Sequence, residues 1–211
     1  MTTQLQETFD AALVNRKLLQ HPFYQRWEAG ELKDGELTSY AEQYRYFETM
    51  LPDFLTRLSE TLPAGPTRDA VLDNYRDEVS PPSHLELFEK FADFYDAADA
   101  PISPAMAALV ASYDEVLHES PAAALAGLLA YESQGAAIAD SKAAGLLKHY
   151  KASNDATAFW TVHGSVEGDH AKWTMDALAS IEPDNTDVEA GARLVGEAWW
   201  SFLDERELLA I

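Results

Sequence analysis

The chain has 211 residues, of which 47% are hydrophobic and 11% aromatic, enough for one domain with a substantial core. Its 36 acidic residues outnumber the 15 Lys and Arg residues, and the formal net charge of −21 opposes binding to nucleic acids and anionic membranes. The absence of cysteine excludes disulfides, thiolate metal sites and cysteine nucleophiles. Because the sequence has neither a long apolar run nor a signal-peptide pattern, we expect a soluble, cytoplasmic protein with a single domain over residues 1–211.

Apolar residues recur at helical spacing, and no useful stretch alternates with the period of a β-strand. Ser103-Pro104 and Ser120-Pro121 are typical helix starts, in which serine caps the helix and proline takes its first position. Predicted helices cover 3–19, 36–62, 67–78, 83–97, about 15 residues from Ser103, about 25 from Ser120, a stretch from 154 or 155 through 178, and a last one from 187. A short aromatic segment with Phe23, Tyr24 and Trp27 follows the first of these helices. We therefore predict an all-α bundle of seven to eight helices.

The strongest motif is His163-Gly-Ser-Val-Glu167-Gly-Asp-His170, inside a predicted helix. Offsets of four and seven residues place His163, Glu167 and His170 on one helical face over two turns. Two imidazoles and a carboxylate in this arrangement suit iron, manganese or zinc. Taken alone, the motif also fits an ordinary polar helix face.

Two further segments supply acids and a histidine. Glu132 interrupts an Ala- and Leu-rich helix, where a buried carboxylate is costly unless a cation or hydrogen bonds compensate its charge. Glu78 and His84 flank a Pro-Pro helix break, and Asp77 competes with Glu78 as a ligand. Each alone also fits an exposed acid or an ordinary first-turn histidine. Together these segments predict a ligand set for two metal ions: Glu78, His84, Glu132, His163, Glu167 and His170.

The order Glu, His, Glu and then H-x3-[DE]-x2-H, on an all-α chain of this length, resembles the haem-oxygenase-like di-metal oxidases. Within them, the chain is similar to the family of the Chlamydia protein associating with death domains, which makes p-aminobenzoate for folate. The resemblance implies a haem-oxygenase-like bundle, two metal ions (Fe/Fe or Mn/Fe), dioxygen and an external reductant. It extends over most of the chain, through His21–Trp27, Tyr40–Tyr46, Glu78–Phe91, Tyr131-Glu132, Lys142 and His170.

The resemblance further implies a reaction that consumes side chains of the enzyme itself. By position, Tyr24 supplies the aromatic ring, Lys142 supplies the amino nitrogen, and Tyr131 is a redox-active neighbour of the ligand Glu132. Lys142 lies about 15 Å beyond Glu132 along an ideal helix, so contact with the same metal ions requires a break near Gly135 or a long reach. Without the resemblance, Lys142 is interpreted as a solvated lysine. Bundles of this kind are often dimers, so we expect a homodimer.

Three positions depart from the family's pattern. Glu167 stands where relatives have Asp, and the spacing from Glu78 to His84 is one residue shorter than usual. Both differences affect the expected metal geometry. Phe159 stands where a further tyrosine is expected, which excludes a redox role for that position here.

Two other functions remain open. A di-metal oxygenase of the same fold would act on an external small substrate, such as a fatty acid or an amine, with Tyr24 lining its pocket. A metal-free ligand-binding or interaction bundle would carry the acids and histidines on its surface. Other proteins of this fold fit less well: TenA-type thiaminases need a cysteine, PqqC-like oxidases use no metal, and a haem oxygenase needs an axial histidine where only His21 lies close by.

The acidic excess is spread along the chain, so we expect a salt-adapted protein whose folded state is destabilised by self-repulsion at low ionic strength. Added KCl screens this repulsion and should raise the melting temperature by several degrees. Thermal unfolding followed by circular dichroism over a KCl series measures the effect. A melting temperature that falls as KCl is added would contradict the hypothesis.

Overall fold

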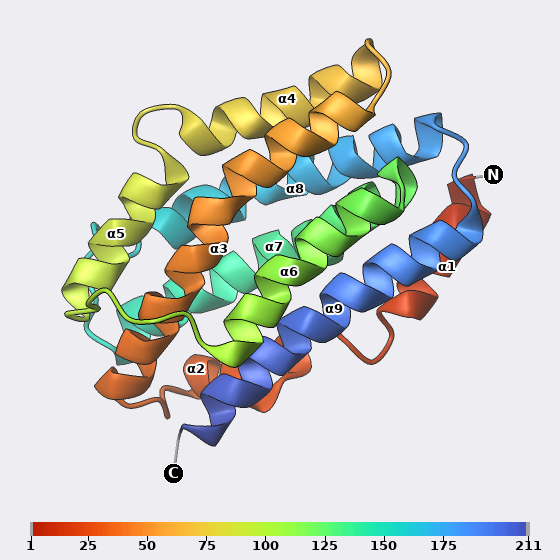
Figure 1. Cartoon of the computed structure of the whole chain (residues 1–211). Helices are drawn as coiled ribbons and strands as arrows, with labels where there is room; N and C mark the ends of the chain where they lie inside the picture. The colour runs from red at the N-terminus through yellow and green to blue at the C-terminus, as the bar shows by residue number, and fades with distance from the viewer. Residues whose placement is uncertain (1, 210–211) are drawn as a thin grey trace.

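The computed structural model describes residues 2–209, with side chains from residue 4 onward, as a bundle of α-helices (Figure 1). The helices are α1 (Thr2–Ala12), α2 (Pro22–Ala29), α3 (Asp34–Thr61), α4 (Pro66–Val79), α5 (His84–Phe94), α6 (Pro104–Glu119), α7 (Pro121–His149), α8 (Ala158–Ser180) and α9 (Asn185–Leu208). The all-α class is confirmed, and the short aromatic segment forms α2. Within residues 2–209, no helix combines the length and apolar character needed to cross a membrane.

The serine caps form as the sequence predicts. Ser103 and Ser120 accept hydrogen bonds from the backbone N–H groups of Met106 and Ala123, which opens α6 and α7. Ser83 caps α5 in the same way and thereby fixes the start of the helix that carries His84.

Several predicted boundaries differ from the structure, among them the end of α5, at Phe94 instead of residue 97, and the start of α3, at Asp34 instead of residue 36. The first helix ends at Ala12 instead of residue 19, because the side chain of Gln134 on α7 bonds the backbone N–H of Leu18 (2.8 Å) and the carbonyl of Arg16 (3.3 Å). Helix α8 begins at Ala158, since residues 154–157 form turns. Helix α9 begins at Asn185, two residues earlier than predicted, behind an Asp184 cap.

Helix α7 is the centre of the bundle and packs against both α8 and α9. Its first half is rich in buried alanine, which lets neighbouring helices approach closely. At the crossing with α9, a Cβ added to Gly191 would lie 2.2 Å from the carbonyl oxygen of Ala123. On the other side, α4 packs against α3 and α8, and α6 lies between α3 and α9 (Figure 1). In this arrangement, one interior region is surrounded by α3, α4, α5, α7 and α8.

We expect Gly191→Ala to lower the free energy of unfolding by about 1–3 kcal/mol, because the added methyl group meets backbone atoms that cannot rotate away. Gly35→Ala is the control: nothing lies within 4 Å of its added Cβ, and it should be neutral or slightly stabilising. Urea denaturation of both variants measures the difference. A Gly191→Ala protein as stable as the wild type would show that α7 and α9 do not approach this closely.

Candidate metal centre

Four helices bring the six predicted ligands into the interior. Helix α4 ends one residue after Glu78, α5 begins with His84, and Glu132 lies in the middle of α7. Helix α8 carries His163, Glu167 and His170 on one face. None of the six side chains is more than 6% exposed, so the interpretation of Glu132 as a solvent-facing acid is wrong.

Glu78, His84 and His163 form the tightest group. One ligand atom from each of them lies within 4.8 Å of the other two. Nδ1 of His84 is 2.8 Å from Oε2 of Glu78, and the two imidazole rings are 4.3 Å apart. Nδ1 of His84 nevertheless has no aligned hydrogen-bond partner among the described residues. Buried nitrogen and oxygen atoms that lie close together without hydrogen bonds between them are suited to bind one metal ion.

His163 has a defined protonation state. Its Nδ1 lies 3.1 Å from the carbonyl oxygen of Phe159. A carbonyl only accepts, so Nδ1 carries the proton and Nε2 keeps a free lone pair. Burial, and secondarily the nearby His84, lower the pKa of His163 well below its usual value. The ring is therefore neutral, as a metal ligand must be.

Glu132 and Glu167 line one small cavity together with Glu78 and His163, whereas His170 is not among the lining residues and pairs with Asp77. Asn74 donates a hydrogen bond of 2.6 Å to Oε1 of Glu132, while Oε2 has no partner within the described part of the chain. Oε2 of Glu167 is likewise unpartnered, and it fits against Gly135, where a Cβ would lie only 2.8 Å away. Burial raises the pKa of both glutamates, and their neighbouring carboxylates raise that of Glu167 further.

The two candidate acids at the end of α4 have different positions. Glu78 belongs to the group with His84 and His163. Asp77 lies 3.1 Å from Nε2 of His170 and is 46% exposed on its side chain, at the outer edge of the site. We therefore interpret Glu78 as the ligand and Asp77 as the residue that orients His170.

The donor set suits iron. Carboxylates and imidazoles are ligands that iron accepts, and Glu78, His84 and His163 together offer one carboxylate and two imidazole nitrogens. Without cations, several buried carboxylates repel one another in a low-dielectric interior, as the raised pKa values show. Divalent ions would remove that repulsion and would provide partners for the unpaired atoms.

Lys142 is not a solvated lysine: it is 2% exposed. Helix α7 runs unbroken past Gly135, and Lys142 lies in a cage of aromatic rings instead of reaching the six ligands. Its Nζ is 2.6 Å from the hydroxyl of Tyr40, which is 3.0 Å from the hydroxyl of Tyr24. Distances from Nζ to the ring centres are 4.0 Å for Trp160, 4.6 Å for Tyr24, 4.8 Å for Tyr40, 5.0 Å for Tyr44 and 5.6 Å for Trp27.

Burial sets the charge state of this cage. It lowers the pKa of Lys142 well below the usual value for lysine, against the opposing effect of Glu48. Burial also raises the pKa of Tyr24 and Tyr40, so both phenols keep their protons. Burial therefore favours a neutral amine at Lys142 beside two neutral phenols.

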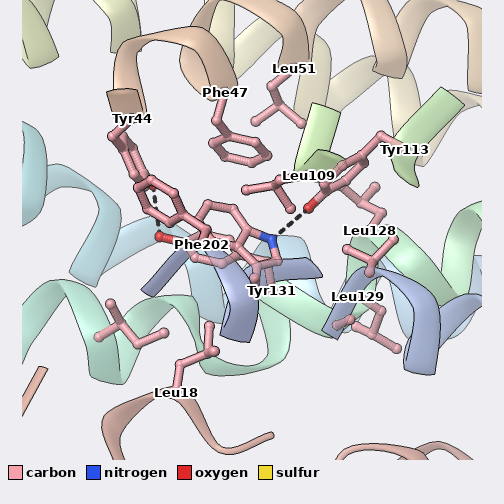
Figure 2. Packing of buried hydrophobic residues seen from close by; sticks show 14 of the residues in the cluster. Leu18, Tyr44, Phe47, Leu51, Leu109, Tyr113, Leu128, Leu129, Tyr131 and Phe202 are labelled. Carbon is pink, nitrogen blue, oxygen red and sulfur yellow. Dashed lines mark hydrogen bonds between the residues drawn. The ribbon is translucent and has the colours of Figure 1, made fainter. Parts of the chain in front are cut away.

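Tyr131 connects the cage to the ligands. It precedes Glu132 on α7, and its hydroxyl is 2.8 Å from that of Tyr44 (Figure 2). A cavity between Tyr131, Phe47 and Tyr113 reaches Glu132 and leaves about 10 Å³ for the centre of a water molecule, roughly the space of one water. The interior is therefore nearly closed at this point.

Several buried polar residues near the site are absent from the predicted set, among them Tyr40, Tyr44, Glu48, Asn74 and Thr174. Glu48 had a detectable signal, because it follows Tyr44 by one helical turn on an otherwise apolar stripe. The same reasoning that singled out Glu132 applies to it. The role of Asn74 depends on a contact between α4 and α7 that spacing along one helix cannot indicate.

Residues 38–201 match a haem-oxygenase-like family described as iron-containing redox enzymes. The chain is also similar to curated 4-aminobenzoate synthases. That of Nitrosomonas europaea is 33% identical and is aligned over 96% of this chain and 91% of its own. That of Chlamydia muridarum is 30% identical, over 94% of this chain and 88% of its own.

Solved structures share the fold at low sequence identity. A CADD-like protein of unknown function from Nostoc punctiforme has a TM-score of 0.78 at 18% identity, over 100% of this chain and 98% of that one. A TenA homologue from Pseudomonas syringae has a TM-score of 0.83 at 13% identity, over 97% and 93%. These neighbours establish the haem-oxygenase-like fold alone.

We expect metal-free protein loaded anaerobically with Fe(II) or Mn(II) to retain close to two ions per chain after desalting. Glu132→Ala and His163→Ala should each lose most of this metal, because each removes a ligand from one group. His118→Ala, which changes an exposed histidine of α6, is the control and should bind metal normally. Elemental analysis measures the content, and wild-type protein without metal would favour the metal-free bundle.

Proposed function

The chain belongs to the family of haem-oxygenase-like, iron-containing redox enzymes and is an oxidoreductase, and we propose that it makes 4-aminobenzoate from its own side chains. The observation that carries the proposal is the buried contact of Lys142, Tyr40 and Tyr24 through their polar groups. An amine and a phenol ring are the two parts from which an aminobenzoate is built. Here they lie together inside the protein.

The structure of the product defines the reaction. In 4-aminobenzoate a carboxylate lies para to an amino group, and in tyrosine Cβ lies para to the hydroxyl. Conversion of Tyr24 therefore requires oxidation of Cβ to the carboxylate and cleavage of the Cα–Cβ bond. It also requires loss of the ring oxygen as water, formation of a ring C–N bond to Nζ of Lys142, and cleavage of the Cε–Nζ bond of that lysine. Dioxygen is the oxidant, and an external reductant supplies the remaining electrons.

The aromatic cage supports Lys142 as the nitrogen donor. A neutral amine has the lone pair needed to bond a ring carbon, and burial favours that form. Nζ lies 4.6 Å from the centre of the Tyr24 ring, and Tyr40 holds both partners by hydrogen bonds. Tyr40 thus positions the amine and the phenol.

Glu78, His84, Glu132, His163, Glu167 and His170 would hold the two metal ions. When bound, an Fe/Fe or Mn/Fe pair supplies the activation of dioxygen and the oxidising equivalents. Tyr131 is suited to electron transfer between the metal ligands and the aromatic cage. It adjoins Glu132 in the chain, and its hydroxyl contacts that of Tyr44. The ring of Tyr44 in turn stacks on that of Tyr40, with 5.3 Å between the ring centres.

The small size of the cavity beside the ligands supports a substrate that the protein itself supplies. The cavity beside the ligands has room for about one water molecule, whereas a fatty acid would need a long channel. Tyr24 is already in the core, 2% exposed. An external substrate would have to displace aromatic rings that pack against one another around it.

Labelled protein tests the source of the product. Protein grown with ring-labelled tyrosine and side-chain nitrogen-labelled lysine is loaded with Fe(II) and Mn(II), then given oxygen and reductant in unlabelled buffer. Mass spectrometry should find 4-aminobenzoate that carries both labels, at no more than one molecule per chain. Unlabelled product, or many turnovers per chain, would contradict a self-derived substrate.

Tyr24→Phe should form no product while binding metal as the wild type does, because the phenol is lost outside the ligand set. Tyr46→Phe is the matched control: this half-buried tyrosine on α3 bonds the carbonyl of Ala100, away from the cage, and its loss should leave product formation unchanged. Product from Tyr24→Phe would exclude Tyr24 as the ring donor.

A further inference from the structure

Glu48 is an unexplained charge in the core. It lies in the middle of α3 and is 2% exposed. Within the described part of the chain, neither of its carboxylate oxygens has an aligned hydrogen-bond partner, although the hydroxyl of Tyr44, one turn earlier, is near enough to lower its pKa. A buried carboxylate without an ion-pair partner is strongly destabilising, so its retention needs a compensating group.

The protein side chains around Glu48 do not provide the missing cation. No salt bridge joins Glu48 to a Lys, Arg or His side chain in the residues described. Lys142 is near enough to interact with the charge of Glu48, but the two side chains form no ion pair. The amino group of Lys142 bonds Tyr40 instead.

The surroundings of Glu48 place it next to the candidate metal centre. Leu51, three residues further along α3 and therefore on the same helical face as Glu48, lines the small cavity together with Glu78 and His163. The charge of Glu78 raises the pKa of Glu48, after burial, and the charge of Glu48 raises that of Glu167. Both effects indicate that the three carboxylates lie in one low-dielectric region.

We propose that Glu48 is a seventh protein ligand of the metal pair, supplied by α3 on the side of Glu78. This inference rests on the metal centre of the proposed function and adds a residue to it. Four buried carboxylates, Glu48, Glu78, Glu132 and Glu167, carry the charge that two divalent ions neutralise. With three carboxylates, the pair would leave an uncompensated positive charge in the core.

The test compares wild type, Glu48→Gln and Glu48→Asp with Glu42→Gln, which neutralises a half-exposed acid on the same helix. Each protein is stripped of metal and titrated anaerobically with Fe(II) or Mn(II). Elemental analysis gives the ions per chain, thermal melts give the stability gained on loading, and Mössbauer spectra of iron-loaded protein report the coordination. None of these measurements depends on product formation.

Glu48→Gln should fold and, without metal, melt at or above the wild-type temperature, because it removes an unpaired buried charge. It should then bind one of its two ions at least about tenfold more weakly, gain less stability from metal, and change one iron component of the spectrum. Glu48→Asp should recover part of the affinity, and Glu42→Gln should match the wild type.

The outcomes separate this inference from the proposed function. Wild type with two ions and Glu48→Gln with unchanged affinity and spectrum would overturn the role of Glu48 alone. Wild type that binds no metal would overturn both. Equal weakening in Glu42→Gln would also overturn it, since any acid of α3 would then have the same effect.

Discussion

The burial of carboxylates in a helical core is the constraint on which the rest of the structure depends. Glu78, Glu132 and Glu167 have almost no contact with water, and burial of carboxylates is costly unless cations or hydrogen bonds compensate it. The helices that carry these acids must therefore keep fixed positions relative to one another around a common centre. Close packing of α7 against α9 at Gly191 and space for Glu167 at Gly135 serve this requirement.

Burial away from water shifts the pKa values of the metal-binding acids and of Lys142 in opposite directions. It raises the pKa of Glu132 and Glu167, whose charged forms a metal ion would stabilise, and it lowers the pKa of Lys142, which favours the neutral amine. A wetter interior would weaken both effects. Metal binding and a nucleophilic amine thus require one property of the fold, a dry core between α3, α7 and α8.

Sequence reasoning located groups whose spacing follows one helix and missed those whose role depends on contacts between helices. The offsets of His163, Glu167 and His170 follow from the helical period, and Glu132 was visible as an acid among alanines and leucines. The end of α1 was not predictable, because a side chain of another helix, Gln134, takes up the backbone groups that a longer helix would pair. Lys142 shows the same limit: its burial results from rings on α2, α3 and α8.

A protein that consumes its own tyrosine has different structural needs from an enzyme with many turnovers. It needs no channel for an incoming substrate, so its core is free to close around Tyr24 with aromatic rings at contact distance. It needs access for dioxygen and electrons, which are small or are transferred between rings. Product release then requires the core to open only once, after cleavage has removed the Tyr24 ring from its packing. On the proposed function, tight packing around the reacting groups therefore carries no penalty in turnover, and the closed interior and the chemistry are consistent with one another.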